Sequence, residues 1–473
     1  MGNNKERIFA DIMSMNPEVT GSCHFVNVRF PNNTNLRFIV DCGLFQEKEH
    51  EKLNEKLIFD PEQIDFCLVT HNHIDHIGRL PLMLRKKYSK EIYTTEDTSK
   101  LMPYALGDTV YILKNISKRK GVKCIYNEQN VDDVFKLVKP CKYAETLQVR
   151  EDVKVTFFTN GHLIGAAMIL VQISFPGCDD INLLFTGDYN NKNVFFKVSQ
   201  LPDWVLKLPL TIILESTYGD MDSNDIEEVF WRNVIDWTRK DGTVLCPVFS
   251  LGRAQEILYE LKLMQEENLL DKDIPIYLDG KLAIKYTEMY LRGALNIKPE
   301  MRDFLPQHFN YVNKITRNSI LFGKEQKILL TTSGMGSYGP AQLYIPEYIK
   351  RRNTLIHFTG YTSEGTLGRR LKDAELNDVV EVGGILLQKS SRVEYTSEYS
   401  AHAKANEMIS ELKKFQNVKL ILLNHGEYET VNTFSKRIMS EVEPKNIGVL
   451  GRKYSFRVNP YGLVKTLPIN FQV

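Results

Sequence analysis

His71-Asn72-His73-Ile74-Asp75-His76 brings three imidazoles and one carboxylate into six consecutive residues. The motif follows the apolar run DFCLVT, which has the length and composition of a strand. Two side chains two positions apart in an extended segment point the same way, so His71 and His73 are expected to face one position. We expect a helix to follow (IGRLPLMLRKKY) and to swing Asp75 and His76 toward a second position. Neutral imidazole and carboxylate suit zinc, so the motif predicts a metal site.

Other short apolar runs along the chain end in the same manner. Each is strand-like, stops at glycine or a polar residue, and then presents an acidic or histidine side chain: Asp41, His162, Asp188, Glu215 and His425. Strand ends of one sheet converge on one edge, where the sites of open α/β sheets gather. The sequence therefore predicts an α/β fold in which these residues meet.

Counting donors distinguishes one metal ion from two. His71, His73, His162 and Asp188 make one four-ligand set. Asp75, His76 and His425 make a second set if Asp188 is shared. A single closed structural zinc site needs only four ligands, so a structural role is the weaker interpretation. Two bridged zinc ions per chain indicate a hydrolytic site that can act on a phosphodiester.

Between about residues 210 and 394 the pattern changes to strand, glycine-containing loop and helix. Three such units (TVLCPVFSLGRAQEILYEL, KILLTTSGMGSYGPAQLYI and TLIHFTGYTSEGTLGRRL) predict a mostly parallel sheet with helices on its faces. Arg253 and the Ser333-Gly334 loop are candidates for binding phosphates, and a purely structural role is nearly as well supported. Ligand-bearing strands resume after about residue 395. We therefore expect one domain made of residues 1–209 and 395–473, with 210–394 inserted into it.

Composition and charge limit the class of protein and the compartment in which it is expected. The chain has 473 residues, 43% hydrophobic and 25% charged, as in ordinary globular enzymes. Its net charge of +1 gives no global basic field, so any nucleic-acid contact must rest on local patches. Seven scattered cysteines without a C-x-x-C pair favour a reducing compartment. With no apolar run long enough to span a membrane and no apolar signal core, we expect a cytoplasmic protein with no membrane partner.

These motifs resemble the metallo-β-lactamase superfamily, and specifically its β-CASP branch of nucleic-acid nucleases. The resemblance covers nearly the whole chain. Four superfamily motifs match Asp41 in IVDCG, the His71–His76 stretch, His162 in GHLIGAA and Asp188 in FTGDYN. The three motifs of the branch match Glu215 in LESTYG, His402 in YSAHA and His425 in NHGE. One departure is Lys404, which stands where the family often has aspartate.

The resemblance implies a metallo-β-lactamase αβ/βα sandwich with an inserted β-CASP α/β domain, two zinc ions, and cleavage of phosphodiesters. His402 and Glu215 are not needed to fill either ligand set. From the residues alone, a buried satisfied pair and a general acid with its supporting carboxylate are equally supported. The resemblance favours catalytic roles: His402 protonates the leaving 3′ oxygen, Glu215 holds its ring, and Asp75 orients or deprotonates the attacking water. Asp41 is expected to hold a ligand by a hydrogen bond.

We therefore predict a zinc-dependent ribonuclease acting on single-stranded RNA and leaving 5′-phosphate and 3′-hydroxyl ends. The His at position 425 is typical of RNA-processing members of the branch, whereas DNA-repair members tend to carry a Val-like residue. No extra domain of the RNase J kind is recognisable, which favours endonucleolytic cutting. The alternatives are a 5′-to-3′ exoribonuclease, a DNA-directed β-CASP nuclease, a small-substrate hydrolase and a catalytically silent subunit. The sequence leaves the oligomeric state open, with a homodimer as one candidate.

Overall fold

The structure is a computed structural model that describes residues 7–15, 18–121, 123–360, 362 and 365–469. It divides into two compact units, Met1–Ser223 with His402–Val473, and Asn224–Ala401. The sequence boundaries of 210 and 394 fall elsewhere, because β11 (Leu210–Glu215) pairs with β10 (Ile181–Phe185) and β20 (Val418–Asn424) in the first unit. The inserted unit of the structure therefore begins later than residue 210, at Asn224, and also ends later than residue 394, at Ala401.

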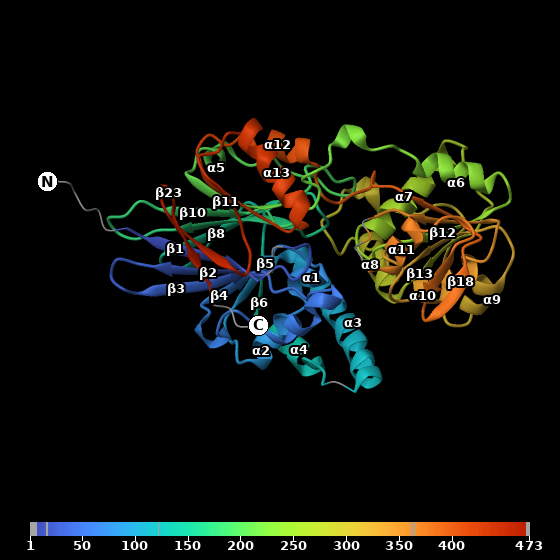
Figure 1. Ribbon diagram of the computed structural model, residues 1–473, viewed down its shortest axis with the longest axis horizontal. Coiled ribbons are helices and arrows are strands. Elements are labelled where there is room, and N and C mark those ends of the chain that lie inside the picture. Colours follow the sequence, from blue (N-terminus) through green and yellow to red (C-terminus); the bar gives the residue numbers. More distant parts are fainter. Residues whose placement is uncertain (1–6, 16–17, 122, 361, 363–364, 470–473) are drawn as a thin grey trace. The chain divides into compact units, whose positions relative to one another are not determined.

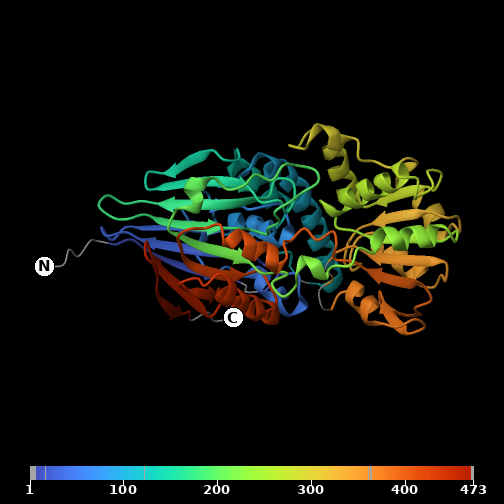
Figure 2. The same ribbon diagram turned by 90° about the horizontal axis from the view of Figure 1, so that it is seen from above.

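Two sheets form the centre of the first unit (Figures 1 and 2). In the described part of the chain, one has the order β23 (Gly462–Pro468), β22 (Tyr454–Asn459), β1 (Phe9–Ser14), β2 (His24–Arg29), β3 (Asn35–Val40), β4 (Phe66–Leu68), β5 (Ile92–Thr95), β6 (Val138–Cys141). The other has the order β21 (Ile447–Val449), β20, β11, β10, β9 (Ala167–Ile173), β8 (Val153–Thr159), β7 (Thr146–Arg150). Strand β22, which is followed by β23, pairs with β1, so segments from early and late in the described chain lie in one sheet.

Apolar side chains fill the space between the two sheets, as alternation along the strands requires. On β8, Val153, Val155 and Phe157 enter this shared core, whereas Phe158 joins the core beneath the outer helices. The central strands of the second sheet, β8 to β11 and β20, thus bury both faces, which explains their nearly continuous apolar runs.

Helices cover the outer face of each sheet, giving a helix–sheet–sheet–helix sandwich (Figure 1). Those packed on the first sheet are α1 (Ile74–Ile77), α2 (Leu80–Arg85), α3 (Glu96–Lys120) and α4 (Glu128–Leu137). Those on the second are α5 (Asp203–Leu206), α12 (Ala405–Leu412) and α13 (Tyr428–Glu441). The α/β sandwich predicted from the sequence is confirmed. The single helix expected after His76 is wrong in detail, since α1 already begins at Ile74 and a new helix starts at Leu80.

Strand direction explains why the predicted site residues converge. Strands β3 and β4 are parallel, so Asp41 and the His71–His76 motif follow the same edge. In the second sheet β10, β11 and β20 are parallel, and β8 shares their direction because β9 runs antiparallel to both β8 and β10. The residues that follow these strands therefore leave from one edge of the sandwich.

The second unit is a parallel sheet with helices packed on it, as the repeated strand–loop–helix pattern predicted. In its described residues the order is β14 (Phe309–Tyr311), β13 (Ile276–Asp279), β15 (Ile328–Thr331), β12 (Thr243–Pro247), β16 (Thr354–Phe358), β19 (Arg392–Tyr395). Its helices are α6 (Phe230–Thr238), α7 (Arg253–Glu266), α8 (Lys281–Leu291), α9 (Arg317–Phe322), α10 (Ala341–Tyr348) and α11 (Leu367–Asp373), followed by the hairpin β17 (Val379–Val382) and β18 (Ile385–Gln388).

Two further observations bear on the sequence predictions. Tyr361, Ser363 and Glu364 of the segment TGYTSEGTLGRRL lie outside the described residues. Within the described ranges, every helix is too short or too polar to cross a membrane.

Candidate metal centre

The first group of donors gathers at the carboxyl ends of β4, β8 and β10. It comprises His71, His73, His162 and Asp188, whose ligand atoms lie within 4.8 Å of one another. Nδ1 of His73 is 3.1 Å from Nε2 of His162. Oδ2 of Asp188 is 3.5 Å from Nε2 of His71 and 3.6 Å from Nε2 of His162. The four-ligand set predicted from the sequence is therefore brought together.

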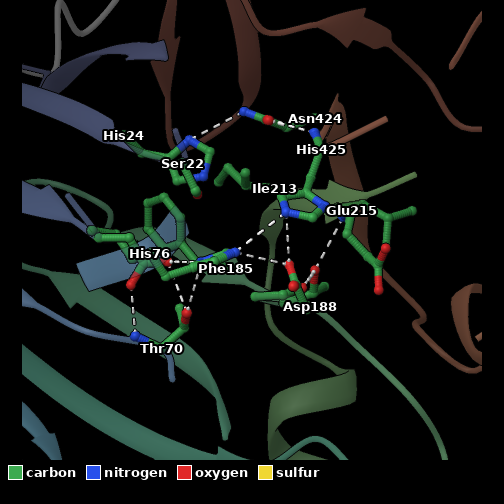
Figure 3. A pocket seen from close by; sticks show the side chains of 15 residues that line it. Ser22, His24, Thr70, His76, Phe185, Asp188, Ile213, Glu215, Asn424 and His425 are labelled. Carbon is green, nitrogen blue, oxygen red and sulfur yellow. Dashed lines mark hydrogen bonds and ion pairs between the residues drawn. The ribbon is translucent and has the colours of Figure 1, made fainter. Parts of the chain in front are cut away.

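The second group comprises Asp75 and His76 of α1 with His425, which follows β20. Nε2 of His76 lies 3.3 Å from Nε2 of His425 and 3.2 Å from Oδ1 of Asp188. Oδ1 of Asp188 is also 3.3 Å from Nε2 of His425 (Figure 3). Asp188 thus presents one carboxylate oxygen to each group, in the bridging position that the sequence assigned to it.

These spacings fit metal ligation. Ligands at zinc distances of 2.0–2.2 Å in a tetrahedron lie about 3.3–3.6 Å apart, close to the separations in both groups. Among the described residues, Nε2 of His71 and Oδ1 of Asp188 are buried atoms without a hydrogen-bond partner. Buried polar atoms are almost always paired, so one such atom at each donor group fits a site that could hold a cation.

Threonine and aspartate side chains on the far side of the imidazoles set their orientation. Oδ2 of Asp41 lies 2.8 Å from Nδ1 of His76, and Asp41 also accepts hydrogen bonds from Thr70 N at 2.8 Å and Thr70 Oγ1 at 2.7 Å. Thr70 Oγ1 lies 3.0 Å from Nδ1 of His71. Asp41 therefore contacts the His76 imidazole at hydrogen-bond distance, and its support of a metal ligand stays a prediction.

Thr70 and Thr217 were missed by sequence reasoning. Oγ1 of Thr217 lies 3.1 Å from Nδ1 of His425. The other ring nitrogen of His425, Nε2, therefore faces the two donor groups. Each threonine stands beside a recognised motif, Thr70 directly before His71 and Thr217 two residues after Glu215. That adjacency was the only available signal, because a threonine hydroxyl has many ordinary roles.

Burial and the nearby carboxylates make the site favourable for a cation. Burial lowers the pKa of His71 well below its ordinary value and that of His73 to about 4, so both imidazoles are neutral at pH 7. At His76 burial opposes the charged form, but the carboxylates of Asp188 and Asp41 outweigh it and raise the pKa well above its ordinary value. Buried carboxylates thus create a local preference for positive charge, which a metal cation satisfies.

His402 and Glu215 form a pair next to the two donor groups. Nδ1 of His402 lies 2.9 Å from Oε1 and 3.1 Å from Oε2 of Glu215, and Nε2 points toward Asp188 with Oδ2 at 4.0 Å. Glu215 is itself fixed by Tyr189 N, which donates to Oε1 at 2.6 Å. The carboxylate therefore holds one ring nitrogen while the other is directed at the site.

Two candidate phosphate-binding features lie in the other unit. Arg253 opens α7, where its guanidinium lies 5.7 Å from the ring centre of Tyr399 and Nη1 bonds Glu256 Oε2 at 3.0 Å. The Ser333-Gly334 loop follows β15, where Gly334 packs against Phe249. Both features have structural contacts within their own unit, and their role toward RNA stays a prediction.

Comparison with protein families accounts for this arrangement. Residues 32–194 match the metallo-beta-lactamase superfamily domain, 254–371 the Beta-Casp domain, and 388–449 the Zn-dependent metallo-hydrolase RNA specificity domain. The chain belongs to the β-CASP branch of the metallo-β-lactamase superfamily. The family resemblance inferred from the motifs is thereby confirmed.

Curated relatives of this β-CASP protein extend over most of its length. An RNase J-like protein of Methanocaldococcus jannaschii is 29% identical over 83% of this chain and 87% of its own. The transcription termination factor FttA of Methanococcus maripaludis is 30% identical over 83% of this chain, which spans 63% of that longer protein. The endoribonuclease ysh1 of Schizosaccharomyces pombe is 28% identical over 83% of this chain and 51% of its own.

Among solved structures, a protein of unknown function from Enterococcus faecalis V583 aligns with a TM-score of 0.53. The alignment covers 98% of this chain and all of the other at 10% identity, so it supports the fold alone. The domain assignments and the ribonuclease relatives make this β-CASP protein a metal-dependent hydrolase of the nuclease class.

Proposed function

We propose that this β-CASP protein is a zinc-dependent ribonuclease that hydrolyses internal phosphodiester bonds of single-stranded RNA. The observation that carries the proposal is the pair of donor groups joined through Asp188, with Nε2 of His402 directed at the same carboxylate. Two metal ions in such a site activate water and neutralise the charge of a phosphodiester. The RNA specificity domain match and the ribonuclease relatives support RNA as the substrate class.

The protein's own residues have distinct roles in this proposal. His71, His73, His162 and Asp188 would hold one zinc ion, and Asp75, His76 and His425 would hold the other together with Asp188. Oδ2 of Asp75 lies 3.7 Å from Nε2 of His425 and 3.8 Å from Nε2 of His76, and it orients the attacking water. His402 donates the proton that the departing 3′ oxygen needs, and Glu215 keeps its Nε2 pointed inward.

These residue roles predict the chemical groups at the ends of the cleaved RNA. Attack by water with a 3′-oxygen leaving group gives 5′-phosphate and 3′-hydroxyl ends and does not use the 2′-hydroxyl. Internal cutting is supported by the relationship to the endoribonuclease ysh1. Preference for RNA over DNA rests on the resemblance at His425. A metal ligand does not read the sugar, so discrimination must come from contacts that sense the 2′-hydroxyl.

Cleavage of three matched substrates tests the proposal. We expect zinc-loaded protein to cut 5′-labelled linear RNA and circular RNA of one sequence, and to cut the matching DNA strand more slowly. All reactions share one salt concentration, because salt alone shifts nucleic-acid binding strongly. Intact circular RNA beside degraded linear RNA would indicate the exonuclease, and equal rates on DNA would indicate the DNA-directed alternative. Products ending in 2′,3′-cyclic phosphate would exclude the proposed chemistry.

A cytoplasmic location and a homodimer remain predictions. All seven cysteines lie in the described ranges and none of them forms a disulfide bond there, which supports a reducing compartment. Light scattering coupled to size-exclusion chromatography measures the oligomeric state directly.

A further inference from the structure

Lys404 is one residue at which this chain departs from the family pattern, and its side chain is almost completely buried. It occupies the N-cap of α12, where Ser, Thr, Asp or Asn is usual, and only 3% of it is exposed. A buried ammonium needs a compensating interaction, and the amino end of a helix disfavours a cation. Capping does not require this side chain, because the Lys404 backbone N–H bonds Glu407 Oε2 at 2.9 Å.

The Lys404 ammonium instead lies over an aromatic face. Its Nζ is 3.4 Å from the ring centre of Tyr218, a buried residue in the turn that follows β11. A cation held over a desolvated tyrosine ring is attracted by the ring quadrupole. This contact makes Tyr218 a partner of Lys404.

Tyr218 also contacts His402. The two ring centres are 6.1 Å apart at an interplanar angle of 68°, an edge-on arrangement. Tyr218 stands three residues after Glu215, the carboxylate that holds Nδ1 of His402. The last residue of β11 and the turn after it therefore both contact the imidazole, by a hydrogen bond at one nitrogen and by an aromatic contact at the ring.

We propose that Lys404 is a positioning residue for His402, acting through Tyr218. Its ammonium holds the tyrosine ring in place, and the ring keeps Nε2 of His402 directed toward Asp188. The inference rests on the proposed function only for its effect on turnover. The contact itself can be measured whether or not the protein cleaves RNA.

Four variants separate positioning from other roles. Lys404→Met removes the cation and Tyr218→Leu removes the ring, and each should lower kcat about tenfold while KM and zinc content stay unchanged. Lys404→Arg should retain most activity, because a guanidinium also stacks on tyrosine. Lys404→Asp restores a helix cap without a cation, so it should remain as slow as Lys404→Met. Lys413→Met, at the exposed end of α12, controls for the loss of one positive charge.

A double-mutant cycle and a spectrum complete the test. If Lys404 acts through Tyr218, the combined Lys404→Met and Tyr218→Leu variant should be no slower than either single variant. NMR of histidine-labelled protein should show the His402 ring resonance shifted in both single variants, even if no RNA is cleaved. An unshifted resonance would overturn the proposal. So would a raised KM with a shallower salt dependence, which would make Lys404 a direct phosphate contact.

Discussion

Asp41 holds the second donor group through His76 and Thr70, so its charge should matter for metal binding more than for folding. Its φ of 62° lies in the left-handed region, which asparagine tolerates and alanine does not favour. We expect Asp41→Asn to keep the fold and to weaken zinc binding about 10- to 100-fold, as for other carboxylates that support a metal-bound imidazole. Zinc titration against a competing chelator measures this. Unchanged affinity would show that Thr70 alone orients the imidazole.

His402 should be dispensable for metal binding but not for turnover. Since its Nδ1 is held by Glu215 and it belongs to neither donor group, His402→Ala should retain zinc and lose about 10²- to 10⁴-fold in kcat, the range for a missing general acid. His73→Ala, which removes a proposed ligand, should lose both zinc and activity. The exposed His308→Asn is a control without effect on either. Loss of zinc in His402→Ala would reassign that residue as a ligand.

Within the second unit, the packing of β16 against α6 buries His357 in its neutral form. Nε2 of His357 lies 3.2 Å from Nδ2 of Asn233, and burial lowers the His357 pKa to about 4. A histidine with a lowered folded pKa stabilises the protein above its unfolded value of 6.5, and this contribution is lost as pH falls. Between pH 6.5 and pH 4, the loss of this contribution should lower the free energy of unfolding of the second unit by roughly 3 kcal/mol.

The variant His357→Gln isolates the effect of histidine protonation on stability. Its amide oxygen can still accept a hydrogen bond from Asn233. The stability advantage of the wild type over the variant should shrink by about 2–3 kcal/mol between pH 7 and pH 4.5. Denaturation followed by tryptophan fluorescence suits the measurement, because Trp231 and Trp237 both lie on α6. His308→Asn, altered at an exposed histidine of the same unit, should follow the wild type throughout. A pH-independent difference between wild type and His357→Gln would contradict the buried neutral state.

For the whole molecule, the metal site joins segments that are distant in sequence. The donors come from four places in the first unit: the His71–His76 motif, His162, Asp188 and His425. We expect about two zinc ions per chain by metal analysis. Zinc at 100 times its Kd should stabilise the first unit by about 2.7 kcal/mol. A stoichiometry near one after zinc loading would exclude the two-metal site.

Calorimetry with and without a chelator shows where that stabilisation acts. Removing zinc should lower the unfolding transition of the first unit by several degrees and leave the transition of the second unit in place, because all the donors belong to the first. Equal shifts of both transitions would mean that the two units unfold together.

The identity of the donor residues could be predicted from the sequence, because it depends on a local rule. A short apolar run followed by His or Asp predicts a strand that ends just before that residue. The carboxyl ends of parallel strands lie at the same edge of a sheet. That rule singled out His162, Asp188 and His425, and the His71–His76 motif supplied the other candidate donors. The insertion came from the strand–loop–helix pattern, and the pairing of His402 with Glu215 came from the family resemblance.

Only the tertiary structure decided what depends on contacts between distant segments. Strand β11 reads as the start of the insertion, yet its hydrogen bonds to β10 and β20 place it in the first unit. The orientation of His425 depends on Thr217, which lies 208 positions away in the chain. In the sequence Lys404 is only a departure from aspartate, and the position of its ammonium over the Tyr218 ring follows from the tertiary structure. Hydrogen-bond and ring partners are fixed by packing in three dimensions, and no periodicity in the sequence encodes them.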